Sequence, residues 1–88
     1  MLSTSLTFIE DPGHGWLVVP IDELRELGIY EKISQFSFLA GDHAYLEEDM
    51  DYGTYVLARR EQGYPDPEVN VRYVDRFNRN KRRFPSHD

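Results

Sequence analysis

Glycine- and proline-rich turns divide this chain into short segments, each with its own hydrophobic pattern. Residues 5–9 alternate and are rich in β-forming side chains, and residues 16–19 are continuously apolar, so both segments predict strands. Between them, residues 11–15 contain one proline and two glycines, which suits a tight connection. We therefore expect a β-hairpin over residues 5–19.

Residues 20–27 have the pattern of a short helix. Pro20 suits the first helical position, and Gly28 suits the position just after the helix ends, with Ile29 as a hydrophobic cap. Acidic residues near the start interact favourably with the positive end of the helix dipole. The apolar side chains that share one face are Ile21, Leu24 and Leu27.

A second hairpin and a second helix are expected to follow. Residues 35–39 alternate with two phenylalanines on one face, residues 40–43 can turn the chain, and residues 44–47 return. Asp49 or Asp51 can cap the helix, which Gly63 ends. The face that this helix buries is expected to consist of Tyr52, Tyr55, Val56 and Arg59.

The predicted fold class is α+β. Alternation over residues 69–73 indicates a last strand, which gives the order ββαββαβ. Two helices can then cover one face of a mainly antiparallel sheet of about five strands. Residues 1–77 would form a single domain, and residues 78–88, which have no hydrophobic period, would form a disordered basic tail.

Composition narrows the cellular setting. The chain contains no cysteine, which excludes disulfides and thiolate metal sites. Its first ten residues lack the basic and apolar regions of a signal peptide. Apolar runs such as residues 16–19 are far shorter than the roughly 20 residues of a membrane-spanning helix. We expect a protein of the cytoplasm with no membrane association.

Charge is sorted along the chain. Residues 1–71 carry fourteen acidic and four basic side chains, whereas residues 72–88 carry two acidic and six basic ones. Because a strong field of one sign steers association, the acidic body favours a basic protein partner, although selection for solubility also produces acidic surfaces. The candidate partner-binding residues are Asp22, Glu23, Glu26, Glu47 and Glu48.

The tail has the opposite composition. Its bases are interleaved with Phe77 and Phe84, a combination that contacts nucleic acid through phosphates and stacked bases. A positive tail on a negative body is also expected to dock on that body or on a second copy. The candidate tail contacts are Arg79, Lys81, Arg82 and Arg83.

The loop before Trp16 raises the question of catalysis. His14, with Glu10 and Asp11 as carboxylate partners, could transfer protons, which leaves a small hydrolase or metal-dependent enzyme as an alternative. No nucleophile lies nearby, and the loop does not match a phosphate-binding motif. A metal site drawing on His14, Asp42, His43 and the carboxylates of residues 47–51 lacks ligand spacing. We expect no catalytic residue, metal or cofactor.

Three segments carry a distinctive pattern: DPGHGWLxVP at residues 11–20, LxxLGIxxKIS at residues 24–34 and GDxAYLEED at residues 41–49. In these segments the chain resembles a family of small uncharacterised proteins of phages and plasmids. The resemblance covers residues 7–57 and implies a mobile-element origin and a compact α+β fold. It implies no activity, and the basic tail lies outside it.

A mobile-element origin suggests a role against host defence. DNA presents a charge about every 1.7 Å of its axis, so dense carboxylates can occupy a nucleic-acid-binding surface in its place. The leading hypothesis is a non-enzymatic acidic interaction module that inhibits a host nucleic-acid-binding defence complex, as an anti-CRISPR or anti-restriction protein. A nucleic-acid-binding accessory protein that uses the basic tail is the alternative.

Overall fold

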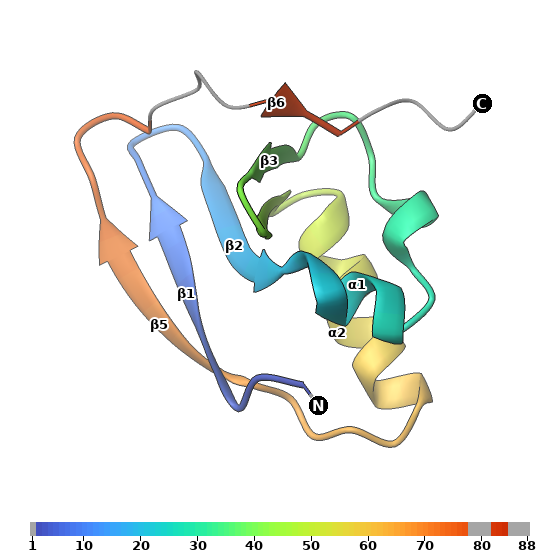
Figure 1. Ribbon diagram of the computed structural model, residues 1–88. Helices are drawn as coiled ribbons and strands as arrows, with labels where there is room; N and C mark the ends of the chain where they lie inside the picture. Colours follow the sequence, from blue (N-terminus) through green and yellow to red (C-terminus); the bar gives the residue numbers. More distant parts are fainter. Residues whose placement is uncertain (1, 78–81, 85–88) are drawn as a thin grey trace.

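The computed structural model describes residues 2–77 and 82–84 of the chain. Six strands of this part form one mixed sheet in the order β5-β1-β2-β4-β3-β6 (Figure 1). The strand β5 runs parallel to β1, and the other neighbouring strands are antiparallel. The strands are β1 (Ser5–Glu10), β2 (Gly15–Pro20), β3 (Phe38–Ala40), β4 (His43–Glu47), β5 (Glu68–Tyr73) and β6 (Arg82–Arg83).

Two helices, α1 (Ile21–Glu26) and α2 (Asp51–Glu61), accompany the sheet, together with a single 3₁₀ turn over Tyr30–Lys32. The α+β class is therefore confirmed. Both helices pack on one face, where Leu24 and Tyr55 are fully buried against Leu17 and Leu46 of the two central strands. Burial of this apolar surface is the main force that holds the two layers together. None of the helices in the described ranges is long and apolar enough to cross a membrane.

The ends of both helices follow from glycines. Gly28 and Gly63 have φ angles of 73° and 83°, in the left-handed region that glycine adopts most readily. After α1, the amide of Gly28 donates to the carbonyl of Arg25 and the amide of Ile29 to that of Leu24, which is the Schellman arrangement. Ile29 is buried as the hydrophobic cap. The predicted end of α1 is confirmed, whereas Pro20 lies at the N-cap rather than inside the helix.

The start of α2 differs from the prediction. Met50 is the N-cap, and neither Asp49 nor Asp51 caps the helix. Oε2 of Glu47 instead accepts hydrogen bonds from the amides of Asp49 and Met50, both at 2.9 Å. Asp51 is only 2% exposed, and its carboxylate accepts hydrogen bonds from the amide and hydroxyl of Ser34 and from the hydroxyl of Ser37.

These contacts also shorten the third strand. The alternation of residues 35–39 predicted a strand, but β3 begins only at Phe38. Because Asp51 binds both Ser34 and Ser37, the segment between the two serines turns instead of extending. Phe36 is consequently 52% exposed, whereas Phe38 is 4% exposed, so the two rings do not share an environment.

The end of the chain is the largest correction to the expected fold. Residues 82–84 were expected to be disordered, but Arg82 and Arg83 pair with Leu39 and Phe38 of β3. Phe84 is 2% exposed and joins the main core, where its ring lies 5.5 Å from that of Tyr30. Arg79 and Lys81 lie outside the described residues.

A second apolar cluster covers the face of the sheet opposite the helices. It is formed by Trp16, Phe38 and Phe77, all nearly fully buried. The rings of Trp16 and Phe77 stack with their centroids 3.9 Å apart and an angle of 17° between the planes. Phe77 follows β5, so the chain beyond the last long strand returns over this face.

Candidate partner-binding groove

An open groove of about 300 Å³ lies beside this second apolar cluster, at the end of the sheet where β2 begins and β4 ends. The turn before β2, the strand β3 and the segment between β4 and α2 supply its walls. We call it the Trp16 groove. The residues that line it are His14, Trp16, Phe36, Phe38, Glu47, Asp49, Met50 and Arg83.

The floor of the Trp16 groove is apolar and partly open to solvent. Trp16 and Phe38 are buried, with ring centroids 6.4 Å apart. Phe36 and Met50 are each 52% exposed, which is unusual for side chains of this size. His14 lies nearly parallel to the indole of Trp16, with centroids 5.7 Å apart. The groove therefore offers aromatic and thioether surface to a ligand.

Two carboxylates border this apolar surface. Glu47 and Asp49 line the groove, and Glu48 and Glu10 lie close enough to act on one another electrostatically. Desolvation and then the neighbouring carboxylates of Asp49, Glu10 and Glu47 raise the pKa of Glu48, although His14 opposes the shift. After desolvation, which is the larger cause, the neighbouring carboxylates add a repulsion. A cation bound there would relieve it.

One guanidinium already lies against this aromatic surface. The Arg83 side chain stands over the ring of Phe38, with Cζ 4.9 Å from the centroid, and donates to the carbonyl of Gln35 at 3.0 Å. This distance is within the range of a cation–π contact. The wall of the groove therefore has the shape and polarity to hold a flat cation.

In the loop that suggested catalysis, the Asp11 carboxylate accepts hydrogen bonds that hold the turn together. Oδ1 of Asp11 accepts hydrogen bonds from the amides of Gly13 and His14 at 3.0 and 2.8 Å, and Oδ2 accepts one from Phe77. Desolvation pushes the pKa of Asp11 upward, but these three amides together outweigh it and hold the pKa below its ordinary value. Asp11 is thus a hydrogen-bond acceptor of the turn, which makes it a poor general base.

Gly15 fixes how this turn meets the sheet. A Cβ atom placed on Gly15 would lie 2.1 Å from Cζ of Phe8, so the buried phenylalanine packs directly on the glycine backbone. The amide of Glu48 donates to the carbonyl of Gly15 at 3.1 Å. The glycine therefore joins the first hairpin to the acidic segment after β4.

The two histidines within the described residues, His14 and His43, do not come together. His43 pairs with Pro20 at the far end of β2, where its ring contacts Asp42 at 2.7 Å, whereas His14 lies at the near end. Within residues 2–77 and 82–84, no group of three or more histidine or carboxylate side chains could hold a metal ion.

Glu23 is not a surface contact, which corrects its place among the partner-binding residues. It is 4% exposed, and its carboxylate accepts hydrogen bonds from the amide and hydroxyl of Ser3 and from the Tyr55 hydroxyl. Arg59, 2% exposed, donates to the same tyrosine and to the carbonyls of Ser3 and Pro65. A buried charge needs such partners, so this network has a structural role.

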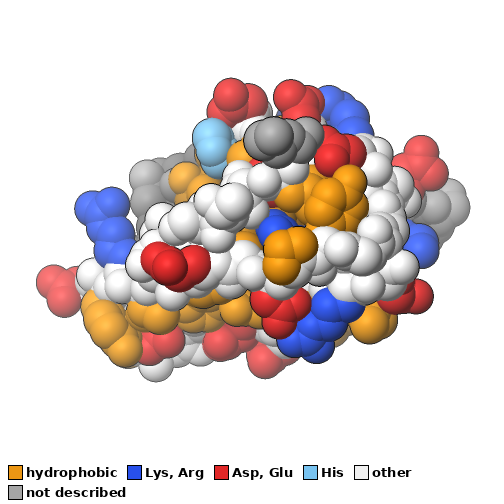
Figure 2. All heavy atoms as spheres, turned by 90° about the horizontal axis from the view of Figure 1, so that it is seen from below, with side chains coloured by type: hydrophobic (Ala, Val, Ile, Leu, Met, Phe, Trp, Pro, Cys, Tyr) orange, Lys and Arg blue, Asp and Glu red, His pale blue; other side chains and the backbone are white. Residues whose placement is uncertain are grey.

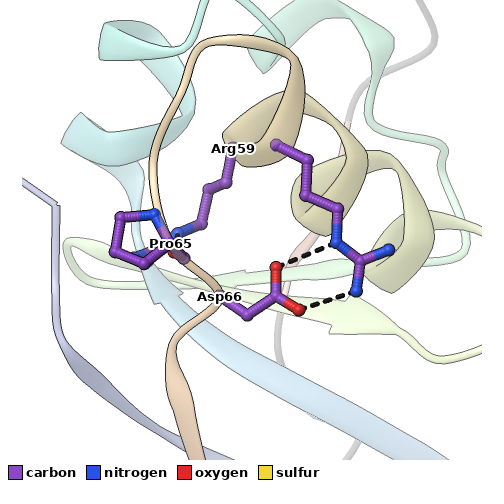
Figure 3. A network of polar contacts seen from close by, with 4 residues as sticks. Arg59, Pro65 and Asp66 are labelled. Atoms are coloured by element: carbon purple, nitrogen blue, oxygen red, sulfur yellow. Dashed lines mark hydrogen bonds and ion pairs between the residues drawn. The ribbon is translucent and has the colours of Figure 1, made fainter.

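The loop after α2 is held from both sides (Figure 3). Arg59 points inward and holds Pro65, while Arg60 makes a two-pronged ion pair with Asp66 at 2.9 and 2.6 Å. The hydrogen bond and charge of Arg60 lower the pKa of Asp66. Both arginines therefore have hydrogen-bond partners within the chain itself.

The remaining acidic candidates divide into two regions. Asp22 and Glu26 are exposed on α1, which follows the far end of β2, whereas Glu47 and Glu48 lie at its near end. Six residues of strand separate the two regions by roughly 17 Å. Figure 2 shows that acidic side chains on the face seen from below are scattered among basic and hydrophobic ones. The five candidates do not form one patch.

Sequence reasoning missed much of the Trp16 groove. The sequence placed Phe36 on a strand face, Asp49 at a helix cap and Arg83 in a disordered tail, and it indicated no role for Met50. The signal that could have found them is the density of large apolar side chains beside the acidic run.

No protein-family model matches the chain, and comparison with curated proteins and with solved structures gives no match either.

Proposed function

We propose that this protein is a non-enzymatic interaction module that binds a basic segment of a partner protein in the Trp16 groove. The observation that carries the proposal is the combination of the exposed side chains of Phe36 and Met50 with the carboxylates of Glu47 and Asp49 in one groove. An arginine or lysine side chain satisfies both parts, because its stem packs on apolar surface while its charge meets the acids and the aromatic faces.

The electrostatics of the groove favour a cation over other occupants. After desolvation, repulsion from Asp49, Glu10 and Glu47 contributes to the raised pKa of Glu48. An anionic ligand would add to this repulsion, and a neutral one would leave it in place. A cationic side chain that enters between these groups gains from charges that the fold has already positioned.

The resemblance to phage and plasmid proteins supports a cellular context for this binding. We propose that the protein acts in the cytoplasm of a host cell on a nucleic-acid-binding defence complex, whose surface is basic because it must neutralise phosphates. Inhibition of CRISPR or restriction would follow if the segment in the groove belonged to that surface. The partner's arginines would then be unavailable to nucleic acid.

A defined probe tests the binding itself. An arginine-rich peptide is titrated into the full chain, and the fluorescence of the single tryptophan, Trp16, reports occupancy of the groove. We expect a saturable change that weakens steeply as salt rises, since the contact is electrostatic. A glutamate-rich peptide and a single-stranded oligonucleotide serve as controls. Binding of the oligonucleotide instead of the basic peptide would favour the nucleic-acid-binding alternative.

Two matched variants locate the site. The pair Glu47→Gln and Asp49→Asn removes two charges that line the groove, and the pair Asp22→Asn and Glu26→Gln removes two charges on α1. We expect the first pair to weaken peptide binding and the second to leave it unchanged. Equal losses in both would show that net charge alone governs binding and would refute the groove. In hosts that carry a defined restriction or CRISPR system, the first pair should also restore defence.

A further inference from the structure

The strand β5 forms one edge of the sheet and has neighbours on one side only within the described residues (Figure 1). The amide of Glu68 donates to the carbonyl of Thr4, and the amide of Val74 donates to that of Glu10. Because backbone groups alternate between the two edges of a strand, the even-numbered residues face β1. The N–H and C=O groups of Val69, Val71 and Tyr73 therefore point outward.

The side chains of this edge are also open. Val71 is 51% exposed and Tyr73 is 76% exposed, both on the face of the sheet that carries the helices, since they are in register with Phe8 and Glu10. An edge strand with free backbone groups and exposed apolar side chains is a template for another strand. Natural proteins usually protect such an edge.

We infer that β5 pairs with β5 of a second copy of this chain, antiparallel and centred on Asn70. In this register Val71 of one copy lies opposite Val69 of the other, and Tyr73 lies opposite Pro67. The exposed apolar side chains then form a continuous row on the helix-bearing face. The outward-facing Val69 and Val71 supply the backbone hydrogen bonds of the pair.

Charge complementarity selects this register. On the other face, Glu68 of each copy lies opposite Arg72 of its partner, which gives two cross-strand ion pairs. A register centred on Arg72 would place two arginines directly opposite each other, and one centred on Val71 would leave Glu68 opposite Val74. Opposite charges across strands stabilise a pair, whereas like charges destabilise it. A second copy is therefore a better occupant than an arbitrary peptide.

Sedimentation across a range of protein concentrations tests this pairing, with charge reversal as the probe. Glu68→Arg and Arg72→Glu should each raise the dissociation constant of the dimer by about tenfold or more, because each creates two like-charged pairs. Mixing the two variants in equal amounts should restore a dimer, since every facing pair is then opposite in charge. The control Glu31→Arg changes the net charge as much as Glu68→Arg, at an exposed site outside the sheet, and should have no effect.

A backbone variant tests the pairing without changing charge. Val71→Pro removes an N–H that faces away from β1, so the fold should survive while the dimer is lost. Val71→Thr keeps the N–H and should remain dimeric, and circular dichroism melts verify that both variants are folded. A wild-type chain that stays monomeric at every concentration overturns the inference. So does a dimer that is indifferent to both charge reversals.

Discussion

Tyr55 donates its hydroxyl hydrogen to Oε1 of Glu23 at 2.7 Å, and both side chains are buried. The same hydroxyl oxygen accepts a hydrogen bond from Arg59 at 2.9 Å, so the tyrosine links two buried charges of opposite sign. Burial and then the bond to Glu23 raise the pKa of Tyr55 well above its ordinary value. The neutral phenol is therefore the form that the fold requires.

Replacing Tyr55 by phenylalanine should destabilise the fold by about 1–3 kcal/mol, because the carboxylate of Glu23 and the guanidinium of Arg59 each lose a buried partner. Chemical denaturation measures the change in the free energy of unfolding. The control is Tyr52→Phe, the same substitution one turn earlier in α2, at a half-buried site. Equal effects of the two variants would contradict a special role for the Tyr55 hydroxyl.

Gly15→Ala should cost about 1–3 kcal/mol, since the new Cβ atom would overlap the buried ring of Phe8. Thermal unfolding followed by circular dichroism reports the loss. Gly13→Ala is the matched control in the same loop, because a Cβ atom there meets nothing closer than 4.0 Å. If Gly13→Ala proved as damaging as Gly15→Ala, general loop flexibility would explain the result better than packing on Phe8.

Phe84→Ala should reduce the free energy of unfolding by about 3 kcal/mol or more, because truncation of a buried phenylalanine leaves a cavity in the core. Phe36→Ala removes the same ring from a site that is 52% exposed and should have little effect on stability. A negligible effect at Phe84 would mean that the end of the chain does not belong to the core in solution.

Glu48→Gln should stabilise the protein at neutral pH. The pKa of Glu48 is raised in the folded state, so its charged form destabilises the fold, and this penalty fades as the pH falls through the raised pKa. We expect a rise in melting temperature of about 1–3 °C at pH 7, which disappears below the ordinary glutamate value of 4.5. A gain of the same size at all pH values would point to packing instead of charge.

The local signals in the sequence were sufficient for most elements. The alternation of residues 69–73 predicted β5, and Gly28 and Gly63 predicted the ends of the two helices. These predictions succeed because a strand period or a positive φ angle is a property of neighbouring residues. The same logic failed at residues 35–37, where a carboxylate distant in sequence, Asp51, overrides local alternation.

The candidate site was predictable only in part. Glu47 lines the Trp16 groove as an acidic residue beside apolar surface, whereas Glu48 is not among the lining residues and Glu23 is turned inward. Nothing in the residues around Glu23 distinguishes it from its neighbours Asp22 and Glu26. Its burial depends on Ser3, which precedes it in the sequence, and on Tyr55, which follows it; the fold brings both side chains to its carboxylate.

By itself, the sequence determined the α+β class, the sorted charge and the absence of cysteine, since composition and short periodicities encode these properties directly. The tertiary structure decided the parallel pairing of β5, the docking of Phe84 and the split of the acidic residues between two ends of the sheet. Each of these depends on contacts between residues far apart in the chain. Local patterns do not specify such contacts, because the energy that selects them is gained only when distant apolar and polar groups are buried together.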